Sequence, residues 1–241
     1  MPAERPPRGA RLAGRYVLLC VVAFVVLFPI YTTLIGAFKP PGHLLDHPLL
    51  PGPFTLDLFR EAWIDGRLGR YLLNSLVVAS IITVGQLVTS VLSGYAFSML
   101  DFPGRNFLFV LFISTMLVPL EATLVVNRRT MGTLGWINTY QGLAIPFVAT
   151  AFGTFLVRQA FLALPRELRD AARIDGAGHL AFLRYVAVPV VRPTLGALAL
   201  FSFLSAWNQY LWPNLITTED DMIAHTNARG AELVISRAGV R

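Results

Sequence analysis

The charged stretch at residues 167–189 holds the residue types whose spacing in this chain most strongly suggests a function. It contains an acidic residue with two alanines, a glycine four residues later and, after nine further residues, the sequence Val-Ala-Val-Pro. The residues that define the pattern are Glu167, Asp170, Ala171, Ala172, Asp175, Gly176 and Pro189. Carboxylates in a first turn and a following glycine are typical of a short helix that turns into a second one. We expect Leu168, Ala171, Ala172 and Ile174 to share one face of the first helix.

A second set of polar residues has the composition of a ligand site. Asn208, Gln209 and Tyr210 stand between two tryptophans, and aromatic faces stack on sugar rings while amides bond sugar hydroxyls. Aromatic belts at a membrane boundary have the same composition, so both interpretations stay open. Glu121 interrupts an apolar tract, where a carboxylate is costly unless it faces water, a partner or a cavity. It either lies at the membrane boundary or lines a translocation path.

Membrane helices must position these residues, because 55% of the 241 residues are hydrophobic and only 14% are charged. An average soluble domain has about 25% charged residues. A helix needs about 20 predominantly apolar residues to cross a bilayer. Five tracts satisfy this length, and the spans are predicted at about 16–38, 72–100, 106–126, 140–163 and 187–216. The predicted fold class is therefore an all-α integral membrane protein with about five transmembrane helices and a helix-turn-helix loop at 164–186.

The basic residues predict the orientation of these spans. Residues 1–15, 101–105 and 158–192 contain eleven of the twenty Lys and Arg residues, and cytoplasmic segments carry such an excess. The N-terminus, as a basic tail at 1–15, and the 164–186 loop are thus expected in the cytoplasm, with the chain in the cytoplasmic membrane. A secretory signal is the alternative for the first tract, but the tract far exceeds the 7–15 residues of an h-region.

Several functional classes lack their sequence signatures. The formal charge of +6 comes from arginines scattered at helix ends, so no nucleic-acid partner is expected. Cys20 is the one cysteine, and the four histidines fall on different predicted loops, so no metal site is expected. No phosphate-binding loop and no nucleophile–base pair stands at recognisable spacing. The chain is not expected to be an enzyme or to carry a cofactor, and any ATP must bind another chain.

The 167–189 stretch resembles the EAA loop of the membrane subunits of ABC importers, although Asp170 stands where that family usually has Glu. Further likeness to the carbohydrate-type, MalG-like permeases spans about residues 16–220, and residues 207–213 are especially similar to permeases for sn-glycerol 3-phosphate. The segments that carry it are Asn74-Ser75, Tyr95–Phe97, Phe102–Arg105, Pro119–Glu121, Asn138–Tyr140, Phe155–Gln159 and Trp207–Pro213. The resemblance implies ATP-driven import of a sugar or polyol phosphate such as glycerol 3-phosphate, with docking of the loop onto an ATPase dimer. It also implies a MalF-like second permease, an extracytoplasmic solute-binding protein and surrounding membrane lipid.

Relatives of this kind have six membrane helices, and from about Ile223 this chain has no apolar run near 20 residues. We expect a chain truncated before the sixth helix, with residues 217–241 as an atypical, disordered tail. Alternatives to the importer hypothesis also remain. The charged loop could lie on the headgroups as an ordinary amphipathic segment. The chain could be a stand-alone secondary transporter or channel, although Glu121 is the one carboxylate in its predicted spans. A membrane-embedded enzyme would need converging catalytic groups, and none is evident.

Overall fold

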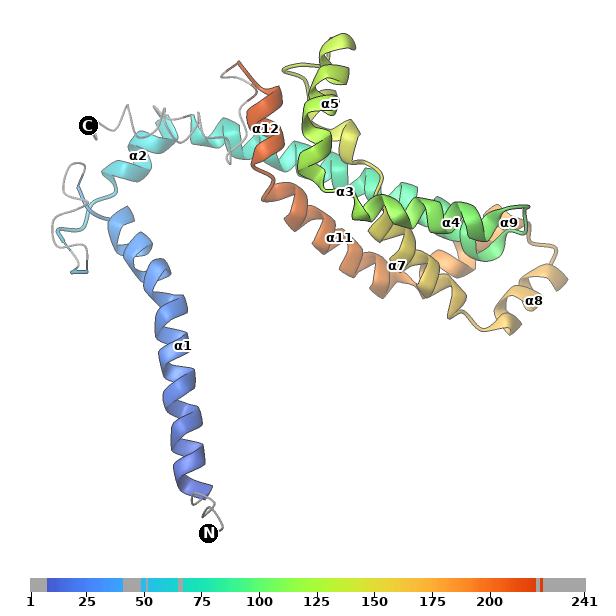
Figure 1. Ribbon diagram of the computed structural model, residues 1–241, viewed down its shortest axis with the longest axis horizontal. Helices are drawn as coiled ribbons and strands as arrows, with labels where there is room; N and C mark the ends of the chain where they lie inside the picture. The colour runs from blue at the N-terminus through green and yellow to red at the C-terminus, as the bar shows by residue number, and fades with distance from the viewer. Residues whose placement is uncertain (1–7, 41–48, 51, 65–66, 220–221, 223–241) are drawn as a thin grey trace. The chain divides into compact units, whose positions relative to one another are not determined.

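The computed structural model describes residues 8–40, 49–50, 52–64, 67–219 and 222, without the side chains of 8–11 and Leu120. The described residues are helical with irregular connections (Figure 1). The chain divides into two compact units, one at residues 1–68 with 232–241 and the other at residues 69–231. Among the described residues, two helices are long and apolar enough to cross a membrane, and the number rises to five if each bent helix pair counts as one span. The predicted all-α membrane fold is confirmed.

The first unit holds α1 (Arg8–Ala37) and α2 (Asp57–Ile64). The apolar part of α1 is Leu12–Ala37, so the helix begins inside the segment predicted as a basic tail at 1–15. Arginine and alanine are good helix formers, which lets the helix extend beyond its apolar part. After α1, the Phe38 ring stacks on Phe54 with centroids 4.9 Å apart, and the Phe38 carbonyl accepts from the Thr55 N–H at 2.9 Å.

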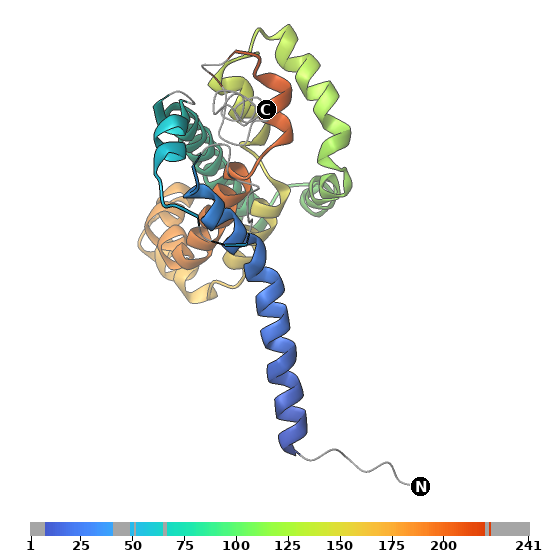
Figure 2. The same cartoon turned by 90° about the vertical axis from the view of Figure 1, so that its left-hand side faces the viewer.

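The second unit is a bundle in which α3, α4, α7 and α11 run side by side (Figure 1). The short helices α8 and α9 lie at one end of this bundle, and α5 and α12 lie at the other (Figures 1 and 2). The bounds are α3 Leu68–Met99, α4 Arg105–Ser114, η1 Thr115–Leu117, α5 Leu120–Thr133, α6 Tyr140–Ala144, η2 Ile145–Phe147, α7 Ala151–Leu162, α8 Arg166–Ile174, α9 His179–Phe182, η3 Leu183–Ala187, α10 Val188–Val190, α11 Arg192–Trp207 and α12 Leu211–Ile216.

Three of the predicted spans are bent or broken. The 106–126 tract bends by 100° where Pro119 holds Val118 in an extended conformation. The 140–163 tract bends by 48° before α7, and α9–α10 meet α11 at 78°. The predicted span 187–216 stops at Trp207, because Pro213 has no N–H for a helical bond to the Gln209 carbonyl and its ring would clash there. The sequence windows located the apolar tracts but did not show these breaks.

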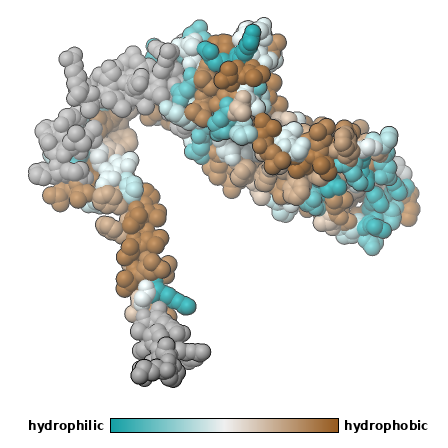
Figure 3. Space-filling model, viewed as in Figure 1, coloured by the Kyte–Doolittle hydropathy of each residue, from teal (hydrophilic) through white to brown (hydrophobic). Residues whose placement is uncertain are grey.

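Small residues set the close approach of α3 and α7. A Cβ at Gly94 would lie 3.0 Å from the Arg158 nitrogen and 3.0 Å from a Val157 methyl. The Ser93 and Thr154 hydroxyls bond each other across the same crossing at 2.7 Å. On the face seen in Figure 3 the bundle is largely hydrophobic, and hydrophilic residues gather at the α8 end and again near α5. This pattern suits a bundle that lipid surrounds, with polar groups at its two ends.

Candidate functional site

The first arm of the predicted loop is α8, which begins after Pro165 and ends at Asp175. Gly176 has φ +75°, its N–H donates to the Arg173 carbonyl at 3.0 Å, and the Ala177 N–H donates to the Ala172 carbonyl at 2.8 Å. These two bonds and the left-handed residue form a Schellman motif, which satisfies the last carbonyls of the helix. Gly176 therefore sets the turn between the two arms.

The second arm is a single run of helix over α9, η3 and α10, so the loop predicted at 164–186 continues to Val190. Residues 183–187 form a π-helical turn directly before Pro189. Proline cannot donate an intrahelical bond, and wider turns absorb such a missing bond. The residue predicted to close the pattern therefore lies inside the second arm. We call the whole segment, residues 164–190, the bracket.

The bracket is fixed to the bundle by an aromatic cluster that the sequence analysis did not find. The Tyr95 hydroxyl lies 3.1 Å from Nδ1 of His179 and donates to the His179 carbonyl at 3.2 Å. The Tyr95 ring meets Phe161 edge to face at 5.9 Å, and Ala172 and Phe182 are buried in the same cluster. Both arms thus contact α3 and α7, so the bracket is expected to move with the bundle.

The outward surface of the bracket is partly apolar. The predicted apolar face of α8 is wrong in part, because Ala172 is buried and Leu168 half-buried while Ala171 is exposed and Ile174 is 87% exposed. The helix is too short to bury four positions, and only one stripe reaches the bundle. Glu167, Asp170, Asp175 and Gly176 are also exposed, as are Leu180 and Tyr185. The bracket therefore offers carboxylates and apolar side chains to whatever lies beyond it.

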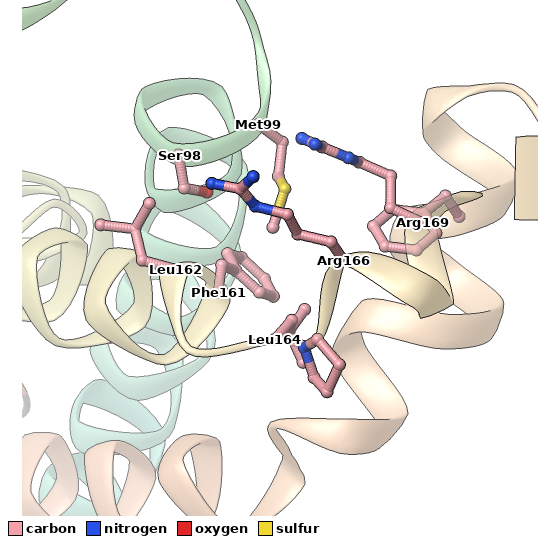
Figure 4. A pocket seen from close by; sticks show the side chains of 9 residues that line it. Ser98, Met99, Phe161, Leu162, Leu164, Arg166 and Arg169 are labelled. Atoms are coloured by element: carbon pink, nitrogen blue, oxygen red, sulfur yellow. The ribbon is translucent and has the colours of Figure 1, made fainter. Parts of the chain in front are cut away.

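A cavity of about 210 Å³ separates α8 from the ends of α3 and α7. Figure 4 shows Arg166 reaching from α8 toward Ser98, with Arg169 beside Met99. The Nε of Arg169 is buried without a hydrogen-bond partner among the described residues. Because of this space, α8 contacts the bundle mainly through Ala172 and is otherwise held by the helix that follows it.

The candidate substrate-path residues are only partly brought together. Gln209 and Tyr210 line a cavity of about 460 Å³ between α3, α11 and α12. The side chain of Asn208 instead donates to the Leu204 carbonyl at 2.8 Å, where it closes the end of α11. Glu121 is exposed in the first turn of α5 and does not line this cavity. Trp212 is fully buried, and its indole N–H donates to the Gly142 carbonyl at 3.1 Å.

The segment after α12 is held by Asn138, whose φ is +57°. Its Oδ1 accepts from the Thr218 N–H at 2.6 Å and from the Glu219 N–H at 3.2 Å, and its Nδ2 donates to the Thr218 hydroxyl at 2.8 Å. Thr217 is buried. The start of the segment predicted as a disordered tail is thus bonded to the bundle, and residues 223–241 lie outside the described residues.

A family model described as "Binding-protein-dependent transport system inner membrane component" matches residues 87–231, which include the bracket, most of the lining of the 460 Å³ cavity and residues 217–231 that the sequence analysis set apart as atypical. The chain belongs to this family. It is a multi-pass membrane subunit of an ABC importer, not an enzyme, and such subunits work with an ATPase and a binding protein.

Two relatives match this permease subunit over most of its length. Proteins from Yersinia pestis bv. Antiqua (strain Antiqua) and Brucella abortus (strain 2308) are both named "sn-glycerol-3-phosphate transport system permease protein UgpE". They are 37% identical to it over 93% and 92% of the chain, covering 82% and 81% of their own lengths. A solved structure of a bacterial ABC transporter involved in import of the acidic polysaccharide alginate matches with a TM-score of 0.80 and 25% identity. The match covers 92% of this chain and 80% of that one.

The permease fold joins residues that sequence reasoning did not connect. The Tyr140 hydroxyl donates to the buried Asn74 amide oxygen at 2.7 Å, across 66 residues. Both residues belong to segments that carry the family resemblance. Membership of these motifs was the sequence feature that could have indicated the contact. Gln86 and Ser202 line the 460 Å³ cavity, and no motif marked either residue. The sequence indicated only that Gln86 and Ser202 are polar residues within uncharged tracts.

Proposed function

We propose that this permease subunit serves an ATP-driven importer of a sugar or polyol phosphate, such as glycerol 3-phosphate, and that the bracket docks onto the ATPase. The observation that supports docking is the construction of the bracket. Its inner side is fixed by Tyr95, Ala172 and Phe182, while its outer side exposes Asp170 and Ile174. A segment anchored on one side and exposed on the other can carry movement between two subunits.

The substrate class rests on the relatives. The two relatives quoted above are named for sn-glycerol-3-phosphate transport, and the solved neighbour imports an acidic polysaccharide. Both cargoes combine hydroxyl groups with negative charge. The bracket residues Glu167, Asp170, Ala171, Ala172, Asp175, Gly176 and Pro189 are assigned to ATPase coupling, and Gln209 and Tyr210 to the substrate path. We do not assign Glu121 and Asn208 to the substrate path, because they do not line the 460 Å³ cavity.

The proposed assembly has the N-terminus of this chain in the cytoplasm, on the same side as the bracket. Arginines at 158–192 support this side by the positive-inside bias. A MalF-like second permease would complete the translocation path, two ATPase subunits would engage the two permeases, and an extracytoplasmic binding protein would deliver the substrate. Closure of the ATPase pair would then pull both brackets and change the side to which the path opens.

Charge reversal at Asp170 tests the docking. Asp170 is exposed, so Asp170→Arg should leave insertion and thermal stability unchanged. In the reconstituted importer it should lower both co-purification of the ATPase and ATP-dependent uptake of sn-glycerol 3-phosphate by at least about tenfold, if one charged hydrogen bond at the interface becomes a repulsion. The matched control is Asp101→Arg, which reverses a charge that is 98% exposed, lies outside the bracket and pairs with Arg105 at 3.0 Å.

If both variants took up substrate equally, the proposal that the bracket couples this subunit to the ATPase would be contradicted. Uptake by the wild-type importer that needs an ion gradient and no ATP would contradict the proposed function as a whole.

A further inference from the structure

The 460 Å³ cavity has the lining of a binding site rather than of a packing gap. Its volume lies within the roughly 300–1,000 Å³ usual for ligand pockets. Ser202 and Ser205 are three residues apart, so they lie on one side of α11, and Gln209 follows the end of that helix. Gln86 of α3 lines the same space, and its amide nitrogen donates to the Phe147 carbonyl at 2.8 Å. The aromatic side chains of Phe147, Tyr210 and Trp212 complete the lining.

Ser202 is the most informative residue of this lining. Its side chain is 1% exposed, and its Oγ has no hydrogen-bond partner among the described residues. Serine hydroxyls in membrane helices usually bond the carbonyl four residues back, as Ser98 does with Gly94 at 2.7 Å. A buried hydroxyl that forgoes any bond costs free energy unless a ligand or water completes it.

The lining is also uncharged. Among the residues that the structure describes, the lining contains no Asp, Glu, Lys or Arg, so it offers hydrogen bonds but no counter-charge for a phosphate. Aromatic faces cover the carbon skeleton of a sugar or polyol, and serine and glutamine side chains pair with its hydroxyls. A phosphate in such a site would be left without a cation at a large desolvation cost.

We propose that Gln86, Ser202, Ser205 and Gln209 form a subsite for the hydroxyl groups of the transported polyol, with Phe147, Tyr210 and Trp212 against its carbons. The phosphate then lies outside this subsite, toward groups supplied by another chain. This inference rests on the proposed function and adds to it which part of the substrate this subunit recognises. It predicts that the subsite selects for hydroxyls and not for charge.

Serine truncation in the reconstituted complex tests the subsite. We expect Ser202→Ala and Ser205→Ala each to lower the amount of sn-glycerol 3-phosphate taken up per ATP hydrolysed by about 3- to 10-fold, the size of one lost hydrogen bond. Uptake is measured with a saturating amount of loaded binding protein, so that delivery does not limit the result. The matched control is Ser114→Ala, since Ser114 is exposed and its hydroxyl bonds only its own helix, at the Leu111 carbonyl.

Thermal stability separates a ligand role from a structural one. Ser202 Oγ makes no internal bond, so its removal should leave the melting temperature of the complex unchanged or slightly raised. A lower melting temperature together with lower uptake would overturn the subsite in favour of a structural role. If all three variants took up sn-glycerol 3-phosphate as well as the wild type, the subsite would be overturned and the proposed function would stand. No uptake of this probe by the wild type would overturn both.

Discussion

At the scale of single residues, Gly176 is the residue whose type is most tightly constrained by the bracket. Its φ of +75° is open to glycine and, at lower cost than to other residues, to asparagine. A Cβ at this position would meet no atom within 4 Å, so steric crowding at Cβ does not exclude other residues. Backbone conformation alone therefore decides which residues can turn α8 into the second arm.

Two substitutions at Gly176 separate conformation from bulk. Gly176→Val should cost about 1–2 kcal/mol at the turn, since a β-branched residue resists positive φ, and should reduce ATP-coupled uptake. Gly176→Asn, which is nearly as large, should retain most of the uptake. The measurement is uptake per ATP hydrolysed in the reconstituted importer. Equal loss in both variants would show that side-chain volume at the ATPase contact matters instead.

At the scale of elements, the α3–α7 crossing depends on positions without side chains. A Cβ at Gly94 of α3 would lie 3.0 Å from the Arg158 nitrogen of α7, and a Cβ at Gly85 would lie 2.7 Å from the Val148 Cβ in the segment just before α7. The crossing also carries Arg158, whose Nε donates to the Phe97 carbonyl at 3.2 Å and whose guanidinium lies 4.1 Å from the Phe109 ring centre. Helices in lipid associate through such close packing and polar contacts, because burial of apolar surface gives little advantage there.

Overpacking at this crossing should destabilise the bundle. Gly85→Ile forces α3 away from Val148, in the segment just before α7, and should cost about 1–3 kcal/mol, seen as a lower melting temperature of the purified subunit in detergent. Gly132→Ala is the matched control, because a Cβ at Gly132 meets nothing within 4 Å and alanine favours helix by up to about 1 kcal/mol. A melting temperature for Gly85→Ile equal to that of the control would mean that α3 does not pack closely against the segment before α7.

At the scale of the whole molecule, the second unit has two ends of different character. The bracket end exposes carboxylates and arginines. At the opposite end Trp212, Leu143 and Leu124 form a second hydrophobic core, close in sequence to the segments that Asn138 joins. The tightly bonded end is expected outside, where a binding protein would deliver substrate, and the bracket end inside. An importer needs both ends fixed to one bundle so that movement at one is transmitted to the other.

Cysteine labelling tests this orientation. Single cysteines at Ile174 and Thr133, both exposed, are introduced after Cys20→Ser removes the native thiol. In intact cells, a membrane-impermeant maleimide should label Thr133→Cys and leave Ile174→Cys unlabelled until the membrane is opened. The reverse pattern would put the bracket outside and contradict its contact with an ATPase.

The sequence by itself determined the properties that depend on local composition. Uncharged tracts of sufficient length predict membrane helices, and the spacing from Asp170 to Pro189 predicts a helix–glycine–helix segment, because both patterns lie within a few turns of chain. The tertiary structure alone decided which distant residues meet. Tyr95 and His179 are 84 residues apart, and no local pattern pairs them.

Burial of particular faces was likewise decided only by packing. The prediction of an apolar face on α8 was wrong at Ile174, which is exposed, because the bundle contacts only the side of α8 that carries Ala172. Amphipathic spacing does not reveal how much of a helix surface its neighbours cover. The unpartnered Ser202 hydroxyl lies in the lining of a cavity that α3, α11 and α12 form together. Composition thus predicted a membrane bundle with a helix–glycine–helix segment, while the cavity arises from long-range contacts.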